Sequence, residues 1–236
     1  MKAFISLCIL LLISSHVACA EDRRGKPASE QEKLSYAMGL DLGAYLKNID
    51  GTLKLDMLVQ GMKDAYQGHS PLMTAEEAKA VQEAFTKRQR EKRIKESGEK
   101  LAANQAAEEK FLVENKAKKD VVETASGLQY KVIKTGDGAK PDAEDMVEVH
   151  YKGTLLDGTE FDSSYKRNQP AQFKVKQVIP GWQEALQLMS VGSEYELYIP
   201  AKLAYGDRGF PPTIEPGATL VFRVELLSLP KAETTD

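Results

Sequence analysis

Cysteine and histidine are almost missing from this chain of 236 residues, which contains two cysteines and three histidines. Cys8 and Cys19 both lie in the first twenty residues, so the remainder has no disulfide, thiol nucleophile or cysteine-based metal site. His69 and His150 are about eighty positions apart and belong to no motif, which is typical of surface residues. The chain is therefore predicted to use no metal or cofactor, and it has almost nothing from which to build a Ser-His-Asp triad.

A large excess of charge of one sign is also missing. The 32 basic and 35 acidic residues give a formal net charge of −3, so no global attraction for nucleic acid is expected. Hydrophobic residues make up 42% of the chain and charged residues 28%, which is ordinary for a folded protein. At this length the chain can form one large domain or two smaller ones.

A long hydrophobic run occurs at the N-terminus, from Phe4 to Ile13 after the basic Lys2. It is about ten residues long, whereas a bilayer-spanning helix needs ~20. Residues 18–20 (ACA) follow it with the small-x-small pattern of a cleavage site. Residues 1–20 are therefore predicted to be a signal peptide, with periplasmic, outer-membrane or surface localisation after cleavage. The open alternative is a lipoprotein signal with Cys19 lipidated.

Two short helices are predicted after the leader. Ser29 and Glu32 match a capping box, and apolar residues follow at helical spacing as far as about residue 51. A second helix is predicted from Asp56 to Gln67. Because two helices of this size cannot enclose a core, residues 21–70 are predicted to be an all-α dimerisation domain whose apolar faces meet a second copy. The alternative is that these faces pack on the C-terminal part of the same chain.

A long connecting helix is predicted for residues 71–120. From Thr74 to Lys119 there is no proline and one glycine, Gly98, and Thr74 with Glu77 matches a second capping box. Charged residues separate the few apolar ones, so the helix is expected to be mostly solvated and to act as a spacer. A coiled coil is the alternative, but the heptad pattern is not sustained.

Residues 121–236 are richer in glycine, proline and β-branched residues, and short alternating runs indicate strands. One helix is predicted, from Gly181 to Met189. Strands and a single helix together indicate an α+β module with an antiparallel sheet. The predicted strands are Leu128–Ile133, Met146–Leu155, Gln172–Val175, Tyr195–Ile199 and Leu220–Leu229.

The stretch from Val149 to Trp182 organises this module. It is predicted to form a strand, a hairpin turn at Asp157-Gly158, a second strand, a polar loop, a third strand and the start of the helix. The aromatic residues Tyr151, Phe161 and Trp182 lie near breaks in this pattern, and Asp162 is adjacent to Phe161. Several aromatic residues near one acid indicate a small apolar pocket with a polar group at its edge.

Several separated motifs resemble those of FKBP-type peptidyl-prolyl cis/trans isomerases, and the nearly full-length match resembles the secreted Mip-like (macrophage infectivity potentiator) members. The N-terminal segments KLSYAMGLDLG (33–43) and VQGMKDAY (59–66) resemble the Mip dimerisation segment. The isomerase motifs are SGLQYKVI (126–133), VHYKGTLLDGTEFDSS (149–164), QVIPGWQEAL (177–186), IPAKLAYG (199–206) and GATLVFRVELL (217–227). The resemblance implies an FKBP-like antiparallel sheet wrapped on one short helix at residues 121–236.

The resemblance also implies a set of site residues. Trp182 is expected to be the floor under the prolyl ring, and Tyr205 with the Ile179 N–H is expected to hold substrate carbonyls. Asp162 is expected to accept a hydrogen bond from Tyr151. The remaining substrate-binding residues implied by the resemblance are Phe161, Arg167, Val178 and Phe222. Two departures from the family pattern, Ala171 and the loop 210–214, leave the substrate side-chain preference and the affinity for macrolides open.

The function implied by the resemblance is isomerisation of Xaa-Pro bonds in unfolded or exported polypeptides, together with chaperone activity. Macrolide inhibitors of the family are expected to bind the same pocket. Slow amide rotation needs no nucleophile, metal or cofactor, so the absence of cysteine is compatible with this function. The alternative is a holdase chaperone for unfolded envelope proteins in which isomerase turnover is incidental.

Overall fold

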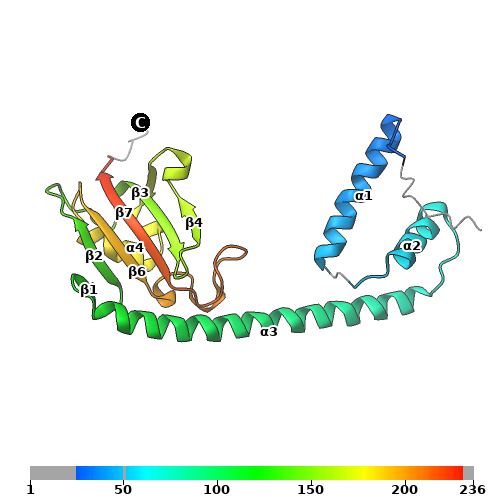
Figure 1. Cartoon of the computed structure of the whole chain (residues 1–236), viewed down its shortest axis with the longest axis horizontal. Coiled ribbons are helices and arrows are strands. Elements are labelled where there is room, and N and C mark those ends of the chain that lie inside the picture. Colours follow the sequence, from blue (N-terminus) through cyan, green and yellow to red (C-terminus); the bar gives the residue numbers. More distant parts are fainter. Residues whose placement is uncertain (1–24, 50–51, 231–236) are drawn as a thin grey trace, which may run out of the picture. The chain divides into compact units, whose positions relative to one another are not determined.

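The chain divides into two compact units, residues 1–77 and residues 78–236 (Figure 1). This computed structural model describes residues 25–49 and 52–230. The predicted signal peptide, including Cys19, lies outside the described residues and stays a prediction. Among the described residues, no helix is both long enough and apolar enough to cross a membrane.

The first unit contains two helices, α1 (Glu30–Ile49) and α2 (Leu55–Gln67), close to the predicted bounds. The predicted capping box forms at the start of α1, where the Glu32 N–H donates to Ser29 Oγ (3.1 Å) and the Ser29 N–H donates to Glu32 Oε2 (2.9 Å). α1 buries none of its residues, and the only buried residue of α2 is Asp64. The two helices therefore leave their apolar side chains without a core, as the sequence predicts.

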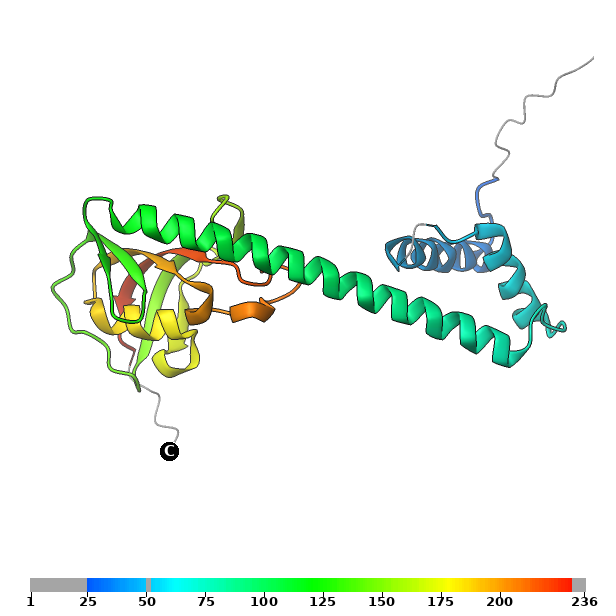
Figure 2. The same ribbon diagram turned by 90° about the horizontal axis from the view of Figure 1, so that it is seen from below.

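The long helix α3 runs from Ala75 to Lys116. Its predicted capping box also forms, because the Thr74 N–H donates to Glu77 Oε2 (2.8 Å) and the Glu77 N–H donates to Thr74 Oγ1 (3.1 Å). All residues from 90 to 100 are exposed, but those at positions 101, 104, 108, 111, 112 and 115 are half-buried or buried. The prediction of a mostly solvated helix is thus correct for the first part of α3 and wrong for its last turns, which pack on the sheet-bearing unit (Figure 2).

The second unit is built on a seven-stranded antiparallel sheet in the order β1-β2-β6-β7-β3-β4, with β5 paired to β3. β3 keeps the predicted bounds and alternation, with Val147, Val149 and Tyr151 buried. The three-residue β1 was not predicted, because so short a strand carries no detectable alternation. The strands are β1 (Val121–Glu123), β2 (Gln129–Lys134), β3 (Met146–Leu155), β4 (Glu160–Ser163), β5 (Ala171–Lys174), β6 (Glu194–Ile199) and β7 (Leu220–Ser228).

The helix α4 (Pro180–Leu188) lies against one face of the sheet and completes its core. Trp182, Ala185 and Leu186 of α4 are buried together with side chains from β3, β6 and β7. Pro at the first turn suits the helix start, because the N–H that it lacks has no intrahelical partner there. Four 3-10 helices complete the unit: η1 (Tyr165–Arg167), η2 (Val175–Gln177), η3 (Ala201–Leu203) and η4 (Gly206–Arg208).

Candidate active site

A cavity of about 350 Å³ opens between α4, the sheet and the connection from β6 to β7. Eight of the nine predicted site residues line it, and the ninth, Arg167, is hydrogen-bonded to two of them. The structure therefore brings together residues that are spread over more than seventy positions of the sequence. The lining residues are Tyr151, Phe161, Asp162, Phe173, Gln177, Val178, Ile179, Trp182, Tyr205 and Phe222.

Trp182, at the start of α4, is 4% exposed and has an aromatic ring on three sides. Its ring centroid lies 5.4 Å from that of Tyr151, 5.8 Å from that of Phe173 and 5.2 Å from that of Phe222, each edge-to-face. This arrangement suits the aromatic quadrupole, because the positive edge of one ring meets the negative face of another. The indole is therefore held rigidly in the cavity wall.

Gly153 on β3 allows the ring of Phe161 to meet that of Phe222 above the strand. Phe161 on β4 and Phe222 on β7 pack edge-to-face with centroids 5.4 Å apart. A Cβ atom at position 153 would lie 2.7 Å from a ring atom of each, closer than packed atoms approach. The missing side chain thus makes room for the aromatic wall.

The polar edge of the cavity consists of Tyr151, Asp162 and Arg167. The Tyr151 hydroxyl donates to Asp162 Oδ2 (2.5 Å), Arg167 Nη1 donates to Asp162 Oδ1 (2.6 Å), and Arg167 Nη2 donates to the Tyr151 hydroxyl (2.8 Å). Burial alone would raise the pKa of Asp162, but the hydrogen bonds from Tyr151 and Arg167 outweigh it and hold that pKa below its ordinary value. Asp162 is therefore an anion at neutral pH.

The same contacts set the state of the Tyr151 hydroxyl. Burial, reinforced by the hydrogen bond to Asp162, raises the pKa of Tyr151 above its ordinary value. Tyr151 therefore stays protonated and serves as a donor. Its ring, which belongs to the aromatic wall, is oriented by the Asp162 carboxylate, which accepts the hydrogen bond of the Tyr151 hydroxyl.

Two further groups lie on the rim of the cavity. Tyr205 is 37% exposed, and burial together with the negative charge of Asp162 raises the pKa of its hydroxyl. Gln183 Nε2 donates to the Val178 carbonyl (2.7 Å), which orients the peptide group that also carries the Ile179 N–H. Within the described part of the chain, neither the Ile179 N–H nor the Tyr205 hydroxyl donates to a protein acceptor.

Two lining residues, Phe173 and Gln177, were not among the predicted site residues. Phe173 is two positions after Ala171 on β5, so both side chains lie on the same face of the strand. The ring of Phe173 contacts both Trp182 and Tyr151, with centroids 5.8 and 6.0 Å apart. The two-residue spacing from Ala171 was the sequence signal that could have placed Phe173 on the cavity side of the strand. Only the pairing of β5 with β3 decides that its ring reaches the cavity.

The loop 210–214, the second departure from the family pattern, borders the cavity through Tyr205. The Phe210 ring packs on Tyr205 with centroids 5.3 Å apart and is 59% exposed. Reciprocal backbone hydrogen bonds join Phe210 and Ile214 at 2.8 and 2.9 Å. An exposed aromatic ring thus extends the rim beyond the cavity.

No group of three or more His, Cys, Asp or Glu side chains suited to a metal ion occurs among residues 25–49 and 52–230. The cavity is lined by one carboxylate, one side-chain amide and two phenols, and the guanidinium of Arg167 is hydrogen-bonded to two of these groups. Such a set can donate and accept hydrogen bonds and can exclude water from an apolar ligand. The arrangement therefore suits an apolar ligand group that is held by hydrogen bonds at its edge.

Comparisons with known proteins identify both parts of the chain. Residues 138–227 match the model of the FKBP-type peptidyl-prolyl cis-trans isomerase family, and residues 31–132 match that of the domain amino terminal to this isomerase. The chain is 43% identical to the outer membrane protein MIP of Legionella longbeachae over 98% of its length and 100% of the relative. It is 40% identical to the peptidyl-prolyl cis-trans isomerase Mip of Coxiella burnetii, covering 97% of this chain and 96% of that one.

A solved structure of the same family has a similar fold. The crystal structure of FkpA from Escherichia coli superposes with a TM-score of 0.65 at 36% identity, covering 85% of this chain and 97% of that one. The expected fold, helices followed by an antiparallel sheet with one short helix, is therefore confirmed. Because both family models match and two relatives are at least 40% identical over nearly the whole chain, the chain belongs to the FKBP-type peptidyl-prolyl cis-trans isomerases and is an enzyme of that kind.

Proposed function

We propose that the cavity accelerates Xaa-Pro rotation without covalent chemistry, by desolvating the amide and binding its twisted geometry. The observation that carries this proposal is the Trp182 floor, which contacts three aromatic rings and has the polar group of Tyr151, Asp162 and Arg167 at the edge of the cavity. A prolyl ring on Trp182 would meet Phe161 and Phe222 as walls. The reacting amide then leaves water, which solvates its dipolar resonance form best. Loss of this solvation weakens the resonance and lowers the barrier to rotation.

The energetics are compatible with this mechanism. Amide resonance sets a rotation barrier of roughly 18–20 kcal/mol. A millionfold acceleration requires about 8 kcal/mol of stabilisation that is specific to the transition state. Desolvation and a few fixed hydrogen bonds can supply this amount together, because a preformed site does not have to reorganise during the reaction.

We assign the rim donors to the substrate backbone. The Ile179 N–H and the Tyr205 hydroxyl are proposed to donate to the carbonyls that flank the proline, which fixes the peptide while its central bond rotates. The orientation of the Val178–Ile179 peptide group by Gln183 supports this role for Ile179. The negative Asp162 is proposed to orient the Tyr151 ring and to favour the dipole of the twisted amide.

An NMR exchange assay on an Xaa-Pro peptide, with and without an FKBP-directed macrolide, tests this function. We expect rapid cis/trans exchange that the macrolide abolishes, because both ligands need the same cavity. Trp182→Ala serves as the site variant, and Trp182→Phe is its milder control. No acceleration by the folded wild-type protein would contradict the proposed mechanism and would favour the holdase alternative, in which the cavity binds apolar segments and turnover is incidental.

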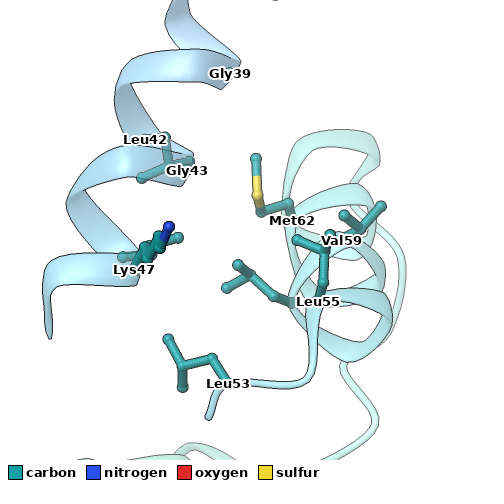
Figure 3. A pocket seen from close by; sticks show the side chains of 10 residues that line it. Gly39, Leu42, Gly43, Lys47, Leu53, Leu55, Val59 and Met62 are labelled. Atoms are coloured by element: carbon teal, nitrogen blue, oxygen red, sulfur yellow. The ribbon is translucent and has the colours of Figure 1, made fainter. Parts of the chain in front are cut away.

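We further propose that the first unit forms a homodimer through α1 and α2. An apolar groove of about 300 Å³ lies between these helices, bordered by Leu42, Leu55, Val59 and Met62 (Figure 3). Leu40 and Met38 of α1 are 58% and 63% exposed, and α1 has no buried residue to compensate. A second copy would remove this apolar surface from water, and two linked active sites would raise the effective concentration for a long client.

We also propose that the mature protein resides in the cell envelope. The signal-like residues 1–20 and the similarity to an outer membrane protein of Legionella longbeachae support this location. Mass spectrometry of the mature N-terminus after cell fractionation provides the test. A chain beginning at Glu21 indicates signal-peptide cleavage, and a lipid-modified Cys19 indicates the lipoprotein alternative, whereas an unprocessed cytoplasmic chain would contradict both.

A further inference from the structure

The last turns of α3 contact the connection between β6 and β7, and this connection carries Tyr205 (Figures 1 and 2). Residues 200–219 contain two short 3-10 helices but no strand. A connection of this length loses substantial conformational entropy when it is ordered, so a precisely placed side chain within it needs anchors. The contacts with α3, all inside the second unit, supply them at both ends.

Glu108 of α3 joins the two ends of this connection. Its Oε2 atom accepts a hydrogen bond from the Ala201 N–H (2.6 Å) and another from Thr219 Oγ1 (2.7 Å). Ala201 lies two residues after the end of β6, and Thr219 directly precedes β7. Both residues are buried. A single carboxylate oxygen thus closes the base of the loop, in charge-assisted hydrogen bonds that are stronger than neutral ones.

One turn earlier on the same face of α3, Asn104 holds the returning arm of the loop. Asn104 Nδ2 donates to the Pro216 carbonyl (2.8 Å), and Lys100, another turn back, pairs with Glu215 (2.6 Å). Gly217, which follows Pro216, has φ +70°, and a Cβ atom at this position would lie 2.7 Å from Leu101 Cδ1. The loop backbone therefore lies directly on the helix surface.

Backbone hydrogen bonds connect these anchored segments to the residues on both sides of Tyr205. The Gly217 N–H donates to the Gly206 carbonyl (3.0 Å), so the arm that Asn104 holds is bonded to the residue after Tyr205. On the other side, the Ala204 N–H donates to the Ala201 carbonyl (2.9 Å), so the end that Glu108 holds is bonded to the residue before Tyr205. The two residues that flank Tyr205, Ala204 and Gly206, are thereby linked through the loop backbone to the segments that α3 holds.

We propose that Glu108 and Asn104 are positioning residues for prolyl isomerisation, which hold Tyr205 at the rim of the cavity from the opposite side of its loop. The inference rests on the proposed role of Tyr205 and extends the catalytic apparatus to a helix that contributes none of the residues lining the cavity. Small displacements of a catalytic group have large effects on rate. The residues from Lys100 onward would then belong functionally to the catalytic module.

A double-mutant cycle in the full-length protein tests the proposal. We expect Glu108→Ala to lower kcat/KM for an Xaa-Pro peptide about tenfold, because the loop loses both anchors at its base. In the Tyr205→Ala background the same substitution should change kcat/KM less than twofold, since the group that it positions is absent. Glu108→Gln keeps an acceptor oxygen and should restore part of the rate.

Two matched controls separate positioning from stability. Glu109→Ala removes an exposed carboxylate one position along the helix and should leave the rate unchanged. Asn115→Ala removes the buried hydrogen bond to Gln129 (2.9 Å), so it should destabilise the fold without accelerating exchange in residues 201–219. Hydrogen–deuterium exchange of that segment should become faster in Glu108→Ala and Asn104→Ala only.

The outcomes distinguish this inference from the proposed function. If Tyr205→Ala lowers the rate while Glu108→Ala does not, or lowers it equally in both backgrounds, the positioning role is overturned and the role of Tyr205 stands. If Tyr205→Ala leaves kcat/KM unchanged, the proposed role of Tyr205 fails and the positioning role fails with it. Unchanged hydrogen exchange in Glu108→Ala would also overturn the anchoring that the inference requires.

Discussion

The two units of this protein use similar apolar residues but differ in what covers them. In the second unit Leu197 on β6 and Val224 on β7 are fully buried between the sheet and α4. In the first unit Leu40 on α1 is 58% exposed and Leu55 on α2 is 67% exposed. Local periodicity is thus enough to form helices and strands, but burial requires a second layer. The isomerase unit supplies that layer from its own chain.

The difference has an energetic consequence. Fully burying a leucine side chain contributes about 1.5–3 kcal/mol. The second unit obtains this stabilisation on folding, whereas α1 and α2 obtain it only when another surface covers them. The first unit is therefore expected to depend on assembly and the second to be stable alone, which the following predictions test.

The largest expected effect is in the core of the isomerase unit. Leu197→Ala should lower its free energy of unfolding by about 3 kcal/mol, because it creates a cavity in a fully packed site. Urea denaturation followed by Trp182 fluorescence measures this change. Leu40→Ala, the matched substitution on α1, should leave the same transition unchanged. Equal shifts in the two variants would mean that both units share one cooperative core.

The next effect concerns assembly of the first unit. Leu42→Asp combined with Val59→Asp places charges in the apolar groove and should raise the dimer dissociation constant at least ~100-fold, about 2.7 kcal/mol. Sedimentation over a concentration series measures it, and peptide turnover should stay normal. Ile94→Asp, at a 61% exposed position on α3, is the control. A dimer that persists in the double variant would place the interface elsewhere.

A smaller effect is expected at the rim of the cavity. Tyr205→Phe removes one hydroxyl that is proposed to bind a substrate carbonyl, so kcat/KM for an Xaa-Pro peptide should fall about tenfold, or about 1.4 kcal/mol. The dimer and the unfolding transition should be unaffected. Tyr66→Phe, at a 94% exposed position on α2, is the matched control. A normal rate in Tyr205→Phe would contradict the proposed role of the hydroxyl.

The smallest effect is that of pH on Asp162. Its folded-state pKa lies below the ordinary value of about 3.9, so its stabilising contribution is complete above that pH and is lost as the pH falls through the folded-state pKa. Because the side chain is 43% exposed, we expect less than about 1 kcal/mol. Carboxyl carbon NMR titration measures this pKa, and Arg167→Met should raise it.

A matched control exists on α3, where Arg88→Met removes an exposed guanidinium far along the sequence from Asp162. This substitution should leave the Asp162 titration unchanged. An Arg167→Met variant with the wild-type pKa would show that the other donors, the Tyr151 hydroxyl and the Ser163 N–H, hold the carboxylate in its charged form. An Asp162 carboxyl carbon shift that changes between pH 5 and pH 8 would contradict the assignment of an ionised Asp162 throughout that range.

Much of the fold followed from local sequence patterns. Both capping boxes formed as predicted, and β3 has the expected bounds, because caps and two-residue alternation depend on neighbouring residues alone. The site residues were found by motif resemblance, since no single aromatic residue distinguishes a cavity wall from a core. Phe173 was missed because only the pairing of β5 with β3 determines that its ring contacts Trp182.

The docked face of α3 was missed for another reason, because its apolar residues Leu101, Phe111 and Leu112 are too few to form a sustained stripe. Asn104, Glu108 and Asn115 are polar, so a pattern of hydrophobic residues assigns them to solvent. Their hydrogen bonds go to partners 112, 93 and 14 positions away, respectively, and such distant partners leave no local signal. A row of polar residues at helical spacing can therefore form a helix contact that is as specific as one formed by a row of apolar residues.

By itself the sequence determined the order and kind of the elements, the scarcity of reactive side chains and the membership of a prolyl isomerase family. The first two depend on residue type and short-range periodicity, and the third depends on the resemblance of several separated motifs to those of the family. Only the tertiary structure decided which rings surround Trp182, how Arg167 and Tyr151 hold Asp162 charged, and where α3 meets the loop of Tyr205. These features arise from strand register and side-chain packing, which join residues that local patterns treat as independent.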